Sequence, residues 1–114
     1  MPRTAPISQI EIEQEILRLT DLLEAETEAF EDLAEDSAKK EATYKSTWAK
    51  EYLSAKGSIK ERESWADYKL ADQCYEHKIA EALVKAKREK LNSLRTSIDA
   101  LRTLAANVRA MVSP

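Results

Sequence analysis

The chain has few of the residues that interrupt helices or cross-link a chain. Its 114 residues include one glycine, Gly57, one cysteine, Cys74, and three prolines, which lie at positions 2, 6 and 114. A single glycine excludes a glycine-rich phosphate-binding loop, and no proline can interrupt a helix between residues 7 and 113. A single cysteine cannot form an internal disulfide, which is typical of a protein in a reducing compartment.

Aromatic residues and long apolar runs are also scarce. Aromatic residues make up 6% of the chain, so we do not expect a large globular core. No stretch approaches the roughly 18 consecutive apolar residues of a membrane span. The N-terminus also lacks the basic and then apolar segments of a secretory signal. We therefore expect no membrane association and a cytoplasmic location.

Charged and helix-forming residues dominate the rest of the chain. Charged residues make up 34%, and Ala, Glu, Lys, Leu and Arg are abundant, as in long helices and coiled coils. Ser8 and Glu11 have the spacing of a capping box at a helix start, and Ser58 and Glu61 repeat it. Gly57 lies directly before the second box, where it suits the end of a preceding helix.

These signals predict an all-α fold, namely a long antiparallel helical hairpin or coiled coil in one domain spanning residues 1–114. We expect the arms at 9–56 and 59–112 and the turn at 57–58. Polar residues weaken the apolar pattern near 36–40, so a break there would give three helices in place of two.

A repeat of seven residues marks the C-terminal part of the chain. It places four arginines in line, namely Arg88, Arg95, Arg102 and Arg109. They flank an apolar seam within residues 91–112 that lies on one face of a helix. Two arms this long share only a narrow strip of contact, so we expect the seam to join further copies in a homo-oligomer. The residues predicted to carry this self-association are Leu94, Ile98, Leu101 and Val108.

Charge is divided unevenly along the chain. Residues 1–41 carry twelve Asp and Glu against four Lys and Arg, whereas residues 42–114 carry nine against fourteen. Such a division favours either a nucleic-acid-binding portion or two halves that attract each other through interhelical ion pairs. A third interpretation is an acidic mimic of DNA that uses residues 11–36.

Aromatic and basic residues are interleaved on both sides of the expected turn. Tyr44, Trp48 and Tyr52 share one helical face, and Trp65 and Tyr68 return from the second arm. A single-strand binder needs this combination, because bases stack on aromatic faces while cations follow the phosphates. The same aromatics can equally fill the core near the turn, with the lysines as a solvated face. The residues predicted to bind nucleic acid are Lys60, Arg62, Lys85, Lys87, Arg88, Lys90, Trp48 and Tyr44.

Groups for catalysis or metal binding are few. Cys74 and His77 lie three residues apart, but a structural zinc site needs four ligands and the chain has no other Cys or His. The pair also lacks a group that would orient a nucleophile. We therefore expect no catalytic residues, no metal and no cofactor, and a protein that is not an enzyme.

Three short segments carry a resemblance to a known family. They are Tyr44-Lys-Ser-Thr-Trp48, Ser58-Ile-Lys-Glu-Arg62 and Lys85-Ala-Lys-Arg88, and an amphipathic helical segment follows at 91–112. Over residues 44–111 this arrangement resembles the UvsY-type recombination mediators of tailed phages.

The resemblance implies a homo-oligomer that binds single-stranded DNA and helps to load a RecA-like recombinase in place of the single-strand-binding protein. It also implies the host cytoplasm as the location of a phage-encoded chain. The alternative is a structural or assembly coiled-coil protein of a phage, whose charges serve helix pairing.

Overall fold

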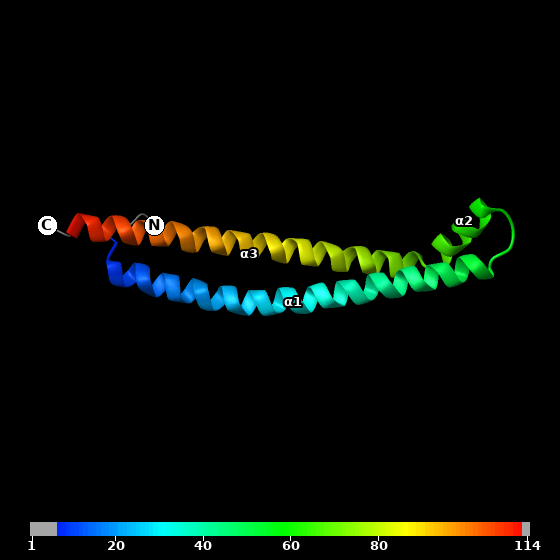
Figure 1. The fold of residues 1–114 in the computed structure, drawn as a ribbon, viewed down its shortest axis with the longest axis horizontal. Helices are drawn as coiled ribbons and strands as arrows, with labels where there is room; N and C mark the ends of the chain where they lie inside the picture. The colour runs from blue at the N-terminus through cyan, green and yellow to red at the C-terminus, as the bar shows by residue number, and fades with distance from the viewer. Residues whose placement is uncertain (1–6, 113–114) are drawn as a thin grey trace. The chain divides into compact units, whose positions relative to one another are not determined.

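The computed structural model describes residues 7–112, which form three α-helices. These are α1 (Gln9–Ser54), α2 (Ile59–Lys69) and α3 (Ala71–Val112). α1 and α3 run antiparallel (Figure 1). The predicted all-α class and antiparallel helical hairpin are therefore confirmed. None of the described helices is both long enough and apolar enough to cross a membrane.

The described residues divide into two compact units, each of which contains antiparallel stretches of α1 and α3. The terminal unit consists of the described residues up to Glu28 and those from Arg88 onward. The turn unit consists of residues 29–87 and includes α2.

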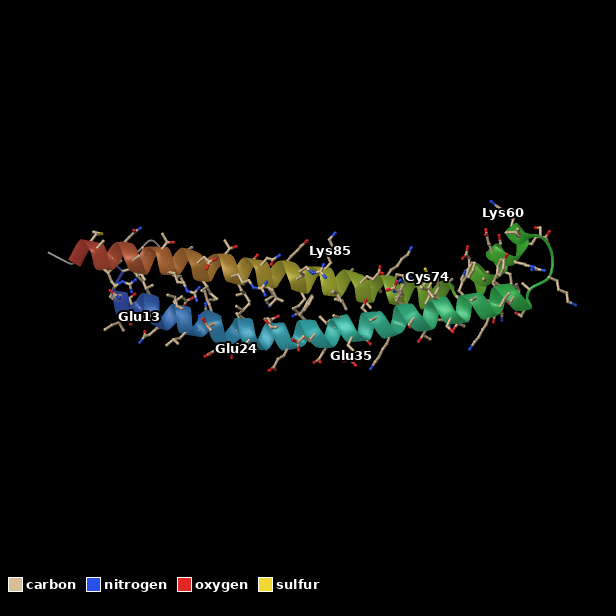
Figure 2. The ribbon with its side chains drawn as sticks, viewed as in Figure 1. Glu13, Glu24, Glu35, Lys60, Cys74 and Lys85 are labelled. Atoms are coloured by element: carbon tan, nitrogen blue, oxygen red, sulfur yellow. The ribbon has the colours of Figure 1, made fainter. Side chains whose placement is uncertain are left out.

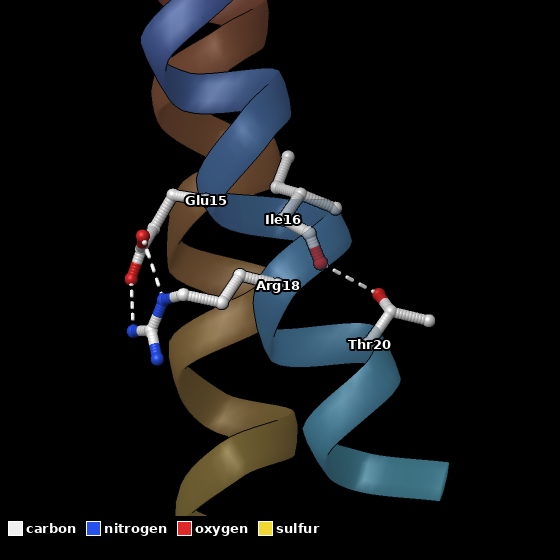
Figure 3. Close-up of polar contacts among 4 residues, drawn as sticks. All are labelled: Glu15, Ile16, Arg18 and Thr20. Carbon is white, nitrogen blue, oxygen red and sulfur yellow. Dashed lines mark hydrogen bonds and ion pairs between the residues drawn. The ribbon is translucent and has the colours of Figure 1, made fainter.

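The start of α1 follows from the predicted capping box. The Ser8 hydroxyl accepts a hydrogen bond from the Glu11 backbone N–H at 3.2 Å and donates one to the Glu11 carboxylate at 3.2 Å. One turn later, two guanidinium nitrogens of Arg18 bind the Glu15 carboxylate, and the Thr20 hydroxyl donates to the Ile16 carbonyl at 2.8 Å (Figure 3). Ion pairs at this spacing stabilise a helix locally.

α1 continues through residues 36–40, so the break considered there does not occur. Ion pairs one helical turn apart support this segment, with Lys39 at 2.9 Å from Glu35 and Lys40 at 3.0 Å from Asp36. Ser37 is 9% exposed and lies in the helix interface, where its small side chain fits without a break. The polar residues that weaken the apolar pattern therefore stabilise the helix instead of ending it.

The turn lies where the glycine predicts it. α1 ends at Ser54, two residues before the expected boundary, and Gly57 has a φ of 114°. This value lies in the region that only glycine adopts without strain. Ser58 then caps α2, and its hydroxyl accepts from the Glu61 backbone N–H at 3.1 Å.

The predicted single helix over 59–112 is wrong, because Leu70 separates α2 from α3. Leu70 has φ −110° and ψ 19°, although its N–H still bonds to Ala66 and its carbonyl to Cys74. Arg62, Ala66, Leu70 and Cys74 are the buried or half-buried positions of this stretch, at successive intervals of four. Each such interval turns the buried face by about 40° on a regular helix. The change of backbone angles at Leu70 accommodates this drift.

Candidate nucleic-acid interface

Trp48, predicted to stack on bases, is engaged within the turn unit. Its ring stacks on Tyr52 with centroids 5.4 Å apart and an interplanar angle of 11°. Its indole N–H donates to the Asp67 carboxylate at 2.9 Å, which connects α1 with α2. The ring is half-buried, so the main contribution of Trp48 is to hold the two helices together.

Tyr44, the second predicted stacking residue, is engaged in the same way. Its ring stacks on His77 with centroids 5.7 Å apart and an interplanar angle of 18°. Burial, together with a hydrogen bond to the Cys74 side chain, raises the pKa of the Tyr44 hydroxyl. Tyr44 therefore belongs to the contact between α1 and α3 in the turn unit.

The accessible aromatic rings are those of α2. Trp65 is 42% exposed and Tyr68 is 75% exposed, and their centroids lie 6.1 Å apart. The Trp65 indole N–H donates to the Glu51 carboxylate at 3.1 Å, and the Lys69 ammonium lies 5.3 Å from the centre of the Trp65 ring. The predicted list of binding residues omits both rings. The signal that identifies them is their place opposite the buried Ala66 on the short α2.

Four lysines at the C-terminal end of α1, in the turn and on α2 make no ion pair among residues 7–112. They are Lys50, Lys56, Lys60 and Lys69. Lys60 lies at the start of α2, beside the turn (Figure 2). Lys56 and Trp65 line one shallow depression together with Glu51 and Glu61. We call the group Trp65, Tyr68, Lys56, Lys60 and Lys69 the turn surface.

Most of the acids beside the turn surface already accept hydrogen bonds. Glu51 accepts from Trp65, Asp67 accepts from Trp48, and the Glu61 carboxylate accepts from the Ser58 hydroxyl at 3.2 Å. Among residues 7–112, none of these acids makes an ion pair with a lysine of the turn surface.

Arg62 is the one predicted cation of α2 that is partly enclosed. Its guanidinium carbon lies 6.0 Å from the centre of the Tyr52 ring, and its Nε atom is buried without a hydrogen-bond partner among the described residues. Arg62 therefore contributes to the packing between α1 and α2 as well as to the charge near the turn.

The predicted basic stretch of α3 belongs to both units. In the turn unit Lys85 is exposed and Lys87 is half-buried, and in the terminal unit Arg88 and Lys90 are exposed. Figure 2 labels Lys85 on α3. The Lys90 ammonium lies 3.2 Å from the Glu26 carboxylate on α1, which is the kind of interhelical pair that the charge division predicts.

Two of the four arginines in line on α3 make local contacts in the terminal unit. Arg95 donates to the Asn92 side-chain oxygen at 3.3 Å, and Arg102 lies 3.5 Å from the Asp99 carboxylate. Both contacts are exposed and within one helical turn, so they contribute at most about 1 kcal/mol each.

The residues predicted to carry self-association form the core of the terminal unit. Ile98 is buried, and Leu94, Leu101 and Val108 are half-buried. Ile12 and Leu19 of α1 are buried in the same unit. The seam therefore packs within the chain.

We compared the chain with known proteins. No protein-family model, curated protein or solved structure matches it.

Proposed function

We propose that this chain is a non-catalytic binder of single-stranded DNA that acts as a recombination mediator. In this role it assists the loading of a RecA-like recombinase in place of the single-strand-binding protein, as its resemblance to the UvsY-type family implies. The observation that supports DNA binding most directly is the turn surface, where exposed aromatic rings lie beside lysines without ion pairs.

The chemistry of the turn surface fits a single strand better than a duplex. Unpaired bases can stack on Trp65 and Tyr68, and the lysines can follow the phosphates on either side. Stacking and charge do not distinguish one base from another, so binding is independent of sequence. Lys85, on α3 in the same unit, is a further exposed cation.

Other lysines of the turn unit provide an internal comparison. Lys39, Lys40 and Lys45 lie 2.8–3.0 Å from Glu35, Asp36 and Glu41. Their charge is balanced by carboxylates within α1, so we expect a phosphate contact with these lysines to contribute less to binding. The turn unit thus contains two sets of three lysines with the same total charge. The lysines of α1 form ion pairs, and those of the turn surface do not.

This difference gives the test of the proposal. Binding of a fluorescently labelled single-stranded oligonucleotide is followed by anisotropy at several salt concentrations. Each phosphate contact contributes about −0.7 to the slope of log K against log salt, so K56A/K60A/K69A should flatten the slope by about 2. The triple variant K39A/K40A/K45A carries the same change of charge and should keep the slope of the wild type. Equal losses in the two variants would contradict a defined turn surface and indicate nonspecific attraction by net charge.

Aromatic stacking has a separate test. W65A/Y68A should weaken binding by about 1–3 kcal/mol for each base that stacks, with the salt slope unchanged. The Trp65 indole also bonds to Glu51, so W65A changes the α1–α2 contact as well as stacking. The single variant Y68A tests stacking with this hydrogen bond intact.

The alternative function is a structural or assembly hairpin whose charges serve helix pairing. The contact between Lys90 and Glu26 favours it, because this pair joins α1 to α3. If the wild-type protein does not bind the oligonucleotide at low salt, the result favours this alternative.

Self-association remains part of the proposed function, but through a different surface from the seam. Tyr75, Ile79 and Leu83 lie at intervals of four on α3 in the turn unit and are all exposed. A row of large apolar side chains on one helix face is typical of a contact with another helix. We therefore assign the contact between copies to these three residues.

A further inference from the structure

We propose that Glu41, His77 and Glu81 form a binding site for a divalent transition-metal ion of the zinc type, which connects α1 to α3 in the turn unit. One imidazole nitrogen and one oxygen from each carboxylate all lie within 4.8 Å of one another. Two of the three ligands are carboxylates, whereas the expectation of no metal rests on the Cys and His residues alone.

The two ligands on α3 have the spacing that chelation requires. His77 and Glu81 are four residues apart and so lie on one face of the helix. The His77 Nε2 atom is 3.3 Å from a Glu81 carboxylate oxygen. Two ligands at about 2.0–2.2 Å from a tetrahedral zinc ion are themselves about 3.3 Å apart. This pair therefore already has the separation of two zinc ligands.

Glu41 supplies the third ligand from the opposite helix. Its carboxylate lies within the same 4.8 Å group and is half-buried. A rotation of the flexible Glu41 side chain can bring its oxygen to a shared ion without a change of backbone. The Lys45 ammonium lies 2.8 Å from the Glu41 carboxylate.

The His77 ring is held in place by packing. Its side chain is 12% exposed, and it stacks on Tyr44. Its Nδ1 atom is buried without a hydrogen-bond partner in the described part of the chain, and its Nε2 atom faces the Glu81 carboxylate. The ring orientation needed for a metal ligand is therefore present before an ion binds.

Charge and coordination number also fit a zinc-type ion. Two carboxylates balance the two positive charges of the ion, and the neutral imidazole adds a ligand that zinc prefers to calcium or magnesium. Glu81 is largely exposed, so water can occupy the fourth position. Metal binding leaves the imidazole proton on Nδ1, where it lacks an acceptor among the described residues. Loss of such a supporting contact typically weakens affinity 10–100-fold, so we expect weaker binding than at a site whose imidazole N–H has an acceptor.

The test uses the full chain after removal of metal with a chelator. Cobalt(II) serves as the spectroscopic probe, and zinc(II) should displace it. Wild-type protein should bind one ion per chain and show the visible absorption of cobalt in a site of low coordination number. At a zinc concentration 100 times the dissociation constant, the melting temperature should rise by about 10 °C.

Five variants test the location of the site. H77Q, E41Q and E81Q should each lose the cobalt absorption and the thermal shift, and circular dichroism of the metal-free variants checks that they fold. E76Q, which changes the neighbouring exposed carboxylate on α3, should behave as wild type. K45A should bind the metal more tightly, because Lys45 lies 2.8 Å from Glu41 and competes with the ion. An equal thermal shift in wild type and H77Q, or no uptake of cobalt by wild type, would overturn the proposal.

Discussion

Glu15 and Arg18 illustrate how single side chains stabilise an exposed helix. The hydrogen bond from Arg18 lowers the pKa of the Glu15 carboxyl. A carboxyl with a lowered pKa in the folded state adds stability above its unfolded pKa and loses it as the pH falls through the folded pKa. The contribution of this pair is therefore present at neutral pH and lost in acid below pH 4.5.

We expect E15Q to melt slightly below wild type at pH 7 and to show a smaller difference at pH 3. Thermal unfolding followed by circular dichroism at both pH values measures this. E24Q is the control, because Glu24 on the same helix makes no ion pair among residues 7–112. The idea fails if the difference between wild type and E15Q is the same at both pH values.

Only some of the contacts between residues distant in sequence could be predicted. A turn at Gly57 predicts that residue i lies near residue 115 − i. This rule holds within one residue for the contacts Trp48–Asp67 and Glu26–Lys90. His77, however, stacks on Tyr44 and not on residue 38, because long side chains reach along the partner helix.

At the scale of the elements, local chemistry was sufficient to predict the turn. Gly57 and the capping box that follows it depend only on neighbouring residues, and both appear as expected. The break at Leu70 could not be predicted, because no glycine or proline marks it. It arises from packing of the α2 face, which only the structure reveals.

The geometry of the turn predicts how a side chain at residue 57 affects stability. A Cβ atom on residue 57 would lie 2.4 Å from a Glu61 carboxylate oxygen, and the φ of 114° strains any side chain. G57A should therefore lower the free energy of unfolding by about 1–2 kcal/mol, measured by urea denaturation.

The double variant G57A/E61A separates the two causes. It removes the carboxylate that the new Cβ would meet but keeps the strained φ. If G57A lowers the free energy of unfolding less in the E61A background than in the wild type, the close approach to Glu61 accounts for part of the cost. If G57A unfolds at the same urea concentration as wild type, Gly57 is not required for the turn.

At the scale of the whole molecule, the distribution of apolar surface predicts which residues the proposed contact between copies would use. The predicted seam lies in the core of the terminal unit, so I79D/L83D and L94D/L101D should behave differently. Ile79 and Leu83 are 43% and 50% exposed, so I79D/L83D should dissociate the oligomer without loss of helix. L94D/L101D places charge in the core and should lower stability by several kcal/mol.

Sedimentation velocity and thermal unfolding distinguish these outcomes. I10D/L17D, which changes two exposed apolar residues of the terminal unit, is the control and should retain the oligomeric state of the wild type. A wild type that is monomeric at micromolar concentration would remove the argument for self-association.

The indole hydrogen bonds of Trp48 and Trp65 have a spectroscopic consequence. Both tryptophans of the chain lie in the turn unit, and each donates to a carboxylate on another helix. Their emission therefore responds to separation of α1 from α2 and is insensitive to events confined to the terminal unit. Helix content measured by circular dichroism covers both units. A comparison of the two signals during denaturation distinguishes loss of the terminal unit from loss of the turn unit without any added label.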